Sequence, residues 1–163
     1  MRFGKLNKHD IANGEGVRVS LFVSGCPHRC KGCFNPETWD RNFGEQFNED
    51  TINEILDAMI PDYITGLTIL GGEPLVRYNA LAVYEICKTV KRKYPHKSIW
   101  VYTGYLYEEV ESLVAMRFID VLVDGRFIED QKDITLKFKG SKNQRIIDVK
   151  ASRRADKVVL WEG

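Results

Sequence analysis

Apolar residues recur along the chain with two periods, one typical of strands and one typical of helices. Short alternating or β-branched runs predict four strands, at residues 17–23, 67–70, 99–102 and 119–123. Apolar residues three or four positions apart predict three helices, from Glu49 to about Pro61, from about Asn79 to Tyr94, and from Glu108 to Met116. Three later apolar segments read as short strands, at residues 134–138, 144–149 and 158–161.

These elements alternate from strand to helix and back to strand. Such an order predicts an α/β protein with right-handed crossovers and a mainly parallel sheet. The 163 residues are too few for an eight-unit barrel, so we expect a partial, open (β/α) barrel or a twisted sheet. No repeat, low-complexity tract or linker divides the chain, so we expect residues 1–163 to form a single domain.

A glycine follows each predicted strand, at Gly25, Gly71, Gly104 and Gly125. In α/β architectures the loops at the carboxyl ends of the strands build the active site. The sequence therefore places any functional site at that end of the sheet.

The charge balance excludes some classes of protein. The chain carries 24 Lys and Arg against 23 Asp and Glu, a formal net charge of +1, which argues against a protein whose main task is to bind nucleic acid. No apolar run approaches the roughly 18–20 residues that a membrane span needs. The first residues, Met1 to Lys8, contain no apolar signal-peptide region, so we expect a cytoplasmic protein.

Three of the four cysteines lie together directly after the first predicted strand, in the pattern C-x3-C-x2-C of Cys26, Cys30 and Cys33. In a reducing compartment such clustering indicates metal binding or redox chemistry. A loop of this size can give one thiolate to each of three irons of a cubane, which leaves one iron open to a substrate or cofactor. Zinc would need a fourth ligand, for which His28 is a candidate, and a disulfide would leave one thiol unpaired. Cys87 lies on the apolar face of a predicted helix and reads as a core residue.

The cysteine pattern and the segment Gly71-Gly72-Glu73-Pro74 follow two consecutive predicted strands. In this order they resemble the cluster motif and the GGE motif of the radical S-adenosylmethionine enzymes, whose fold is a partial, open (β/α) barrel. The resemblance implies that the three cysteines hold a 4Fe-4S cluster and that its open iron binds the amino and carboxylate groups of S-adenosylmethionine. It also implies that Gly71, Gly72 and Glu73 meet the ammonium group of this cofactor, with which the Glu73 carboxylate can pair.

One position departs from the superfamily pattern. The residue before the last cysteine is commonly aromatic, and here it is Gly32, with Phe34 after the cysteine instead. Gly32 can offer its backbone carbonyl to the adenine amino group, but it cannot stack on the ring. The resemblance therefore implies that Gly32, Cys33 and Phe34 face the nucleoside.

Further segments narrow the resemblance to one family. They resemble the activating proteins of anaerobic ribonucleoside-triphosphate reductase at residues 13–18, 21–26, 33–39, 100–105, 120–127 and 140–145. This family implies an oxidoreductase that uses a 4Fe-4S cluster and S-adenosylmethionine to generate a glycyl radical on the reductase under anaerobic conditions, releasing 5′-deoxyadenosine and methionine. The implied partners are the large subunit of the reductase and a low-potential electron donor such as flavodoxin, with no nucleic acid and no membrane.

Two other functions remain open on the sequence. A zinc-binding adaptor could recognise a protein partner without catalysis, and a radical S-adenosylmethionine enzyme could act on a small molecule. The chain is short, so a partial barrel would leave its mouth open, which suits a loop of a macromolecular substrate better than a small molecule. No side chain is an evident general base, which fits transfer of a hydrogen atom rather than a proton.

Overall fold

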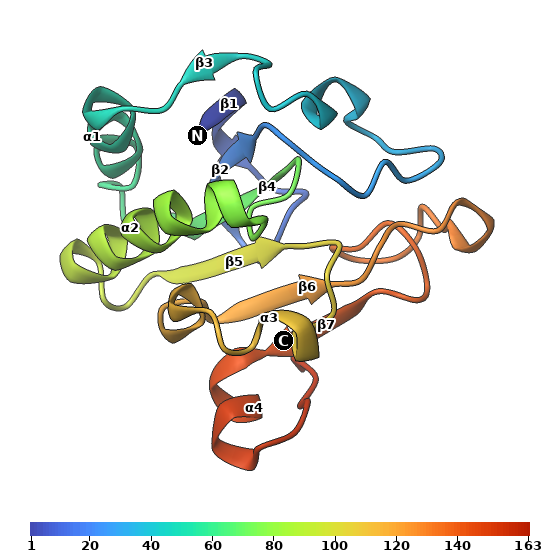
Figure 1. The fold of residues 1–163 in the computed structure, drawn as a ribbon. Helices are drawn as coiled ribbons and strands as arrows, with labels where there is room; N and C mark the ends of the chain where they lie inside the picture. Colours follow the sequence, from blue (N-terminus) through green and yellow to red (C-terminus); the bar gives the residue numbers. More distant parts are fainter.

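The computed structural model describes all 163 residues, and its centre is a seven-stranded sheet with the order β3-β1-β2-β4-β5-β6-β7 (Figure 1). The strands are β1 (Arg2–Asp10), β2 (Val17–Val23), β3 (Glu45–Gln46), β4 (Ile64–Gly71), β5 (Ser98–Tyr102), β6 (Val121–Asp124) and β7 (Arg145–Asp148). The four predicted strands correspond to β2, β4, β5 and β6, which form the middle of the sheet. The α/β class is therefore confirmed.

The predicted partial, open (β/α) barrel with mainly parallel strands is wrong. The pairs β2–β4, β4–β5 and β5–β6 are parallel, but β1–β2, β1–β3 and β6–β7 are antiparallel, so half of the six neighbouring pairs run in opposite directions. The antiparallel pairs lie toward the two edges, and the molecule is an open mixed sheet.

Two connections without a crossover explain the antiparallel pairs β1–β2 and β6–β7. The loop of residues 11–16 joins β1 to β2 and is too short to carry the chain back along the sheet, so the two strands run in opposite directions. Residues 125–144 join β6 to β7 and contain only a 3-10 turn, η3 (Glu129–Gln131). The chain therefore re-enters the sheet at the end where it left.

Four α-helices accompany the sheet: α1 (Glu49–Ala58), α2 (Arg77–Lys93), α3 (Tyr107–Val110) and α4 (Val149–Ala155). The predicted helices at 49–61 and 79–94 are confirmed as α1 and α2. Asn48 begins α1 with a capping box, in which its side chain accepts from the Thr51 amide. The predicted helix at 108–116 is wrong, because extended backbone at Leu113 separates the single turn α3 from a 3-10 turn, η2 (Val114–Arg117).

The predicted strands near the end of the chain are only partly present. The segment 144–149 contains β7, but residues 134–138 form turns and residues 158–161 contribute only an isolated bridge between Leu160 and Ile147. Phe138 and Trp161 of these segments pack on Trp100 of β5, so both segments cover one face of the sheet.

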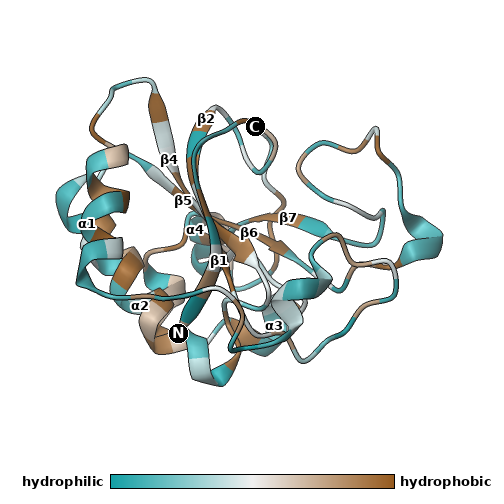
Figure 2. Ribbon diagram, turned by 90° about the horizontal axis from the view of Figure 1, so that it is seen from above, coloured by the Kyte–Doolittle hydropathy of each residue, from teal (hydrophilic) through white to brown (hydrophobic).

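The main hydrophobic core lies between the helices and one face of the sheet. Alternate strand residues, among them Val19, Leu21 and Ile69, pack there against Ile55 of α1 and Val83 of α2. Figure 2 shows hydrophobic residues gathered along the central strands and hydrophilic residues on the outer sides of α1 and α2. The opposite face of the sheet carries a smaller cluster formed by Trp100, Val121 and Val123, with Phe138 and Trp161 packed against it.

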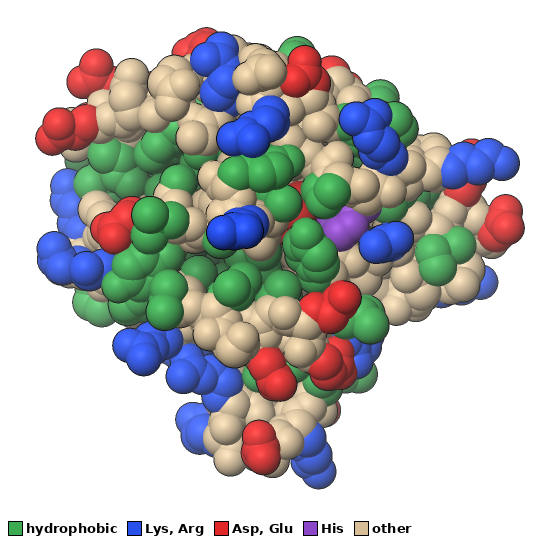
Figure 3. All heavy atoms as spheres, in the orientation of Figure 1, with side chains coloured by type: hydrophobic (Ala, Val, Ile, Leu, Met, Phe, Trp, Pro, Cys, Tyr) green, Lys and Arg blue, Asp and Glu red, His purple; other side chains and the backbone are tan.

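The surface of the protein carries charged side chains of both signs. Positive and negative side chains are interspersed over the face seen in Figure 3, as the near-equal numbers of acidic and basic residues suggest. No helix is both long and apolar enough to cross a membrane.

The loops that follow β2 and β6 project from the same end of the sheet (Figure 1), which is the carboxyl end of its parallel strands.

Candidate functional site

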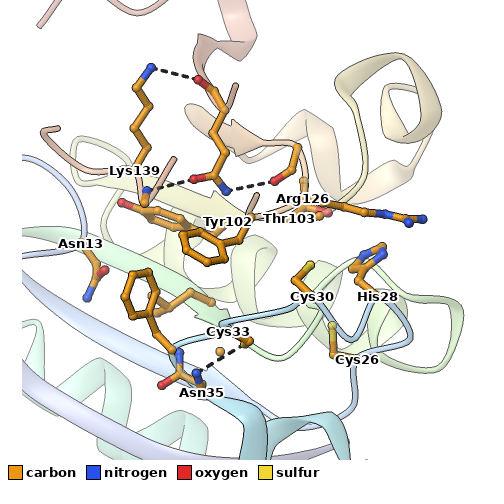
Figure 4. A pocket seen from close by; sticks show the side chains of 18 of the residues that line it. Asn13, Cys26, His28, Cys30, Cys33, Asn35, Tyr102, Thr103, Arg126 and Lys139 are labelled. Carbon is orange, nitrogen blue, oxygen red and sulfur yellow. Dashed lines mark hydrogen bonds between the residues drawn. The ribbon is translucent and has the colours of Figure 1, made fainter. Parts of the chain in front are cut away.

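The cysteine loop follows β2 and curls back on itself within a few residues. Gly32 has a φ of 76° and Arg29 a φ of 49°, and two left-handed residues so close together turn the loop sharply. As a result Cys26, Cys30 and Cys33 are all partly buried and line the same cavity, whose volume is about 560 Å³ (Figure 4).

The three thiols are spread around the cavity wall rather than gathered on one point. No group of three or more His, Cys, Asp or Glu side chains lies close enough to hold a single metal ion. A cubane distributes its ligands over three irons, so its thiolates lie farther apart than the ligands of one zinc ion. Three thiols on the wall of one cavity can each hold one iron of such a cluster.

Backbone amides surround the sulfur atoms. The Asn35 amide lies 3.4 Å from Cys33 Sγ and donates to it. Burial raises the pKa of the Cys26 and Cys30 thiols, whereas amide hydrogen bonds, from His28 and Arg29 to Cys26, act in the opposite direction. Amide donors around a cluster stabilise the charge on its sulfur ligands, so this donor set suits a thiolate-bound cluster.

Gly71, Gly72 and Glu73 form another part of the cavity wall, where β4 ends. The Glu73 side chain is completely buried, and its carboxylate accepts four hydrogen bonds: from His28, Leu75, Thr103 and Gly104. The Gly72 carbonyl, in contrast, receives no hydrogen bond from the protein. The sequence predicts that the Glu73 carboxylate pairs with an ammonium group. In the structure, protein donors already occupy its acceptor positions.

His28, the candidate fourth zinc ligand, directs its Nε2 atom to Glu73. Its Nε2 lies 2.7 Å from Glu73 Oε1, and its ring packs edge-on against Tyr105 with centroids 4.7 Å apart. The structure thus joins two motifs that the sequence presents separately. Cys87 has no part in the cavity, since it is fully buried in the main core as predicted.

The residues next to Cys33 divide between the cavity and its surroundings. Phe34 lines the cavity and is 60% exposed, with its ring 5.0 Å from that of Phe127 and the Lys132 ammonium 5.3 Å from its centroid. Gly32 does not line the cavity, and a Cβ there would lie 3.0 Å from the Glu129 side chain. Phe34 is therefore the aromatic side chain that this loop offers to a ligand.

The remaining wall comes largely from residues 125–144, of which the sequence placed Gly125 at this end of the sheet. Residues 125–144 line the cavity through Phe138, Lys139 and Gln144, among others, and lie over the face of the sheet that carries Tyr102. The Tyr102 hydroxyl is buried without a hydrogen-bond partner, and burial raises its pKa. Phe138, Lys139 and Gln144 reach the cavity only through the return of the chain from β6 to β7, which apolar periodicity does not predict.

Comparisons with known proteins agree with this geometry. The sequence profile of a family described as "4Fe-4S single cluster domain" matches residues 12–147. The chain is 37% identical over 148 residues to a protein of Enterobacteria phage T4, 43% over 143 residues to one of Haemophilus influenzae, and 40% over 141 residues to one of Escherichia coli K12.

Each of these relatives bears the name anaerobic ribonucleoside-triphosphate reductase-activating protein. The alignments cover 90%, 84% and 83% of this chain and 93%, 91% and 90% of the respective relatives. Such identity over most of both chains indicates a shared fold. The chain therefore belongs to the family of anaerobic ribonucleoside-triphosphate reductase-activating proteins, whose 4Fe-4S single cluster domain it contains.

Proposed function

We propose that this protein generates a glycyl radical on an anaerobic ribonucleoside-triphosphate reductase, using a 4Fe-4S cluster and S-adenosylmethionine. One observation carries the proposal: three thiols and the Gly71-Gly72-Glu73 segment line a single cavity at the carboxyl end of the sheet. The family supports the choice of partner, because its members are named for the activation of this reductase.

Cys26, Cys30 and Cys33 are the proposed ligands, each for one iron, which leaves the fourth iron without a ligand from this loop. The amide donors near the sulfurs would offset the negative charge of the thiolates and so influence the potential of the cluster. When bound, the cluster and S-adenosylmethionine supply the electron and the cleavable carbon–sulfur bond, and the products are methionine and 5′-deoxyadenosine with a hydrogen atom from the glycine Cα.

The chain's own residues bind and orient the cofactor in this proposal. Gly71 and Gly72 would bring the backbone close to the ligand, and the Gly72 carbonyl, which accepts no hydrogen bond from the protein, would accept one from the ammonium group. Cys33 and Phe34 face the nucleoside, and Gly32 contributes through its backbone only, since Glu129 covers its Cα.

The proposed protein partners approach from the open side of the cavity. A glycine of the reductase must come within about 3–3.5 Å of the reacting carbon, so a loop of its large subunit would have to enter the cavity. The electron would come from an external low-potential donor such as flavodoxin, because the one cysteine outside the cluster loop, Cys87, is buried in the core. We further propose that the protein acts in the cytoplasm as one domain.

Anaerobic reconstitution with iron and sulfide tests the proposal. We expect about four irons per chain, reductive cleavage of S-adenosylmethionine to 5′-deoxyadenosine, and a glycyl radical signal in electron paramagnetic resonance (EPR) only when the reductase is added. A protein that binds zinc in place of iron, or that cleaves the cofactor but leaves the reductase without a radical, would refute the proposed function.

A further inference from the structure

A buried hydrogen-bonded pair links the cysteine loop to the strand ends behind it. His28 lies inside the loop, two residues from Cys26 and two from Cys30, and its side chain is 4% exposed. Its Nε2 lies 2.7 Å from Oε1 of Glu73, whose side chain is 0% exposed. Figure 4 shows the His28 ring beside Cys26 and Cys30. A hydrogen bond this short between two buried side chains fixes the position of both.

The Glu73 carboxylate accepts hydrogen bonds from the cysteine loop and from the segments that follow β4 and β5. His28 Nε2 and the Gly104 amide donate to Oε1, both at 2.7 Å. The Thr103 hydroxyl donates to Oε2 at 2.8 Å and the Leu75 amide at 2.9 Å. A carboxylate has about four acceptor positions, so none remains for a ligand. The Glu73 carboxylate therefore acts toward the protein, as the common attachment of the cysteine loop, the end of β4 and the end of β5.

Gly104 makes room for this attachment. A Cβ at this position would lie 2.4 Å from His28 Cδ2 and 2.7 Å from its Nε2. On the other side the His28 ring packs edge-on against Tyr105, at 76° between the ring planes. The ring is thus held between the backbone at Gly104 and an aromatic side chain, with only one direction in which Nε2 can donate.

We propose that His28 and Glu73 are positioning residues, which set how the cysteine loop stands against the wall formed by Gly71 and Gly72. This inference rests on the proposed function and specifies how its site is held. Movement of His28 would carry Cys26 and Cys30 with it, because both are its near neighbours in the chain. The cluster would then face the cofactor wall at a different distance or angle, although its three ligands would still be present.

A positioning role and a purely stabilising role predict different results. If the pair only stabilises the fold, its loss lowers the free energy of unfolding but leaves cofactor affinity and the cluster spectrum unchanged. If it positions the loop, a folded variant assembles its cluster and yet binds S-adenosylmethionine in an altered geometry. Groups that orient the direct ligands of a metal site typically change affinity by about 10- to 100-fold when they are removed.

The test compares three variants of the reconstituted full-length protein. His28→Phe keeps a flat ring but removes the donor, whereas His28→Gln retains a donor at a similar reach. His9→Phe is the matched control, since His9 bonds the Tyr63 hydroxyl at 3.2 Å on the exposed surface and does not line the cavity. The measurements are iron content, the change in the EPR signal of the reduced cluster on titration with S-adenosylmethionine, and thermal unfolding.

We expect His28→Phe to retain its iron and to bind S-adenosylmethionine about tenfold more weakly, with a diminished change in the EPR signal. His28→Gln should stay within about threefold of the wild type, because it still donates to Glu73. His9→Phe should match the wild type in all three measurements. Unchanged affinity and an unchanged spectrum in a folded His28→Phe variant would overturn the positioning role.

If His28→Phe does not fold, Thr103 provides a second test of the same carboxylate. Thr103→Val removes the hydroxyl donor at nearly constant shape, and Thr103→Ser retains it. Weaker cofactor binding in the valine variant alone would support the proposal, and equal binding in both would overturn it. Wild-type protein that holds a cluster without any spectral response to S-adenosylmethionine would instead refute the proposed function, and the positioning role with it.

Discussion

Lys91 Nζ lies 2.6 Å from Asp120 Oδ2 and thereby ties the last turns of α2 to the start of β6. The same carboxylate accepts from the Ile99 amide at 2.7 Å, and its other oxygen lies 3.0 Å from Lys150 Nζ. The Asp120 side chain is 15% exposed, so these interactions are only partly screened by water. One carboxylate thus joins α2, β5 and α4 at the end of the sheet opposite the cysteine loop.

This carboxylate should make the protein sensitive to acid. Burial acts to raise the pKa of Asp120, but hydrogen bonds from Lys91, Ile99 and Lys150 outweigh it and lower the pKa below its usual value. A lowered folded-state pKa contributes stability above the unfolded value of about 3.9, and this stability is lost as the pH falls through the folded value.

The variant Asp120→Asn should therefore unfold more easily at pH 7, by about 1–3 kcal/mol in urea titrations. The difference from the wild type should shrink as the pH falls below about 4. Asp62→Asn on the exposed surface should show neither effect. A difference between wild type and Asp120→Asn that stays constant from pH 7 to pH 3 would contradict this account.

Arg18 is the largest polar side chain that is completely buried. Its donors reach three carbonyl and three hydroxyl oxygens on β4, β5 and the loop before β2, at Glu15, Thr65, Leu67, Thr68 and Ser98. Burial lowers the pKa of Arg18 to about 10, and the guanidinium also faces the Trp100 ring at 5.5 Å. A lysine has a single ammonium group and cannot reach all of these acceptors.

Arg18→Lys should consequently lower the free energy of unfolding by about 2–4 kcal/mol, since several buried acceptors lose their donor. Arg154→Lys on the exposed side of α4 is the matched control and should unfold like the wild type. Equal stability of the two variants in denaturant titrations would show that the buried Arg18 guanidinium does not stabilise the fold more than a lysine does.

The fold could be predicted from sequence where apolar periodicity was strong. β2, β4 and β5 are short apolar runs, and α1 and α2 carry regular apolar stripes. The apolar pattern does not predict β1, because only Phe3 and Asp10 of its nine residues are buried. Its position depends on backbone hydrogen bonds to β2, which no local pattern reveals. The direction of β7 depends likewise on the path of residues 125–144 over the sheet.

The site divides in the same manner between local and long-range features. The spacing of Cys26, Cys30 and Cys33 is visible within eight residues, and so is the glycine pair before Glu73. The hydrogen bond between His28 and Glu73 joins positions 45 residues apart, and it requires both loops to have folded. A binding motif that is continuous in the sequence can therefore be predicted from the sequence. Contacts between two motifs that lie far apart in the sequence cannot.

The four cysteines should separate into two groups by reactivity. Burial raises the pKa of Cys87 to about 12, and its side chain is fully buried. Iodoacetamide at pH 8 should therefore label Cys26, Cys30 and Cys33 of the folded, cluster-free protein, with no label on Cys87 until denaturant is added. Mass spectrometry of tryptic peptides measures this directly, and early labelling of Cys87 would show that α2 opens readily.

The same division should hold for the cluster. Replacement of Cys26, Cys30 or Cys33 by Ala should remove the cluster absorbance and cleavage of S-adenosylmethionine after reconstitution. Cys87→Ala should preserve both, with a cost of about 1 kcal/mol in stability for a small cavity in the core. Loss of the cluster in a folded Cys87→Ala protein would contradict the proposed ligand set.

The rim of the cavity should contribute to recognition of the reductase if the proposed function is correct. Ile134 lies on this rim and is 90% exposed, which leaves a large apolar side chain almost entirely in water. Leu81 on α2 is 70% exposed and does not line the cavity, so it provides a control of the same size. Burial of such a side chain in a complex is worth about 1.5–3 kcal/mol.

Ile134→Gln should therefore raise the KM for the reductase about tenfold, a change that corresponds to about 1.4 kcal/mol. Cleavage of S-adenosylmethionine without the reductase should not change, because position 134 lies at the rim and the thiols lie on another part of the wall. Leu81→Gln should behave like the wild type in both assays. If the two variants yield the same glycyl radical signal at limiting protein, the docking surface lies elsewhere, and the exposure of Ile134 has another cause.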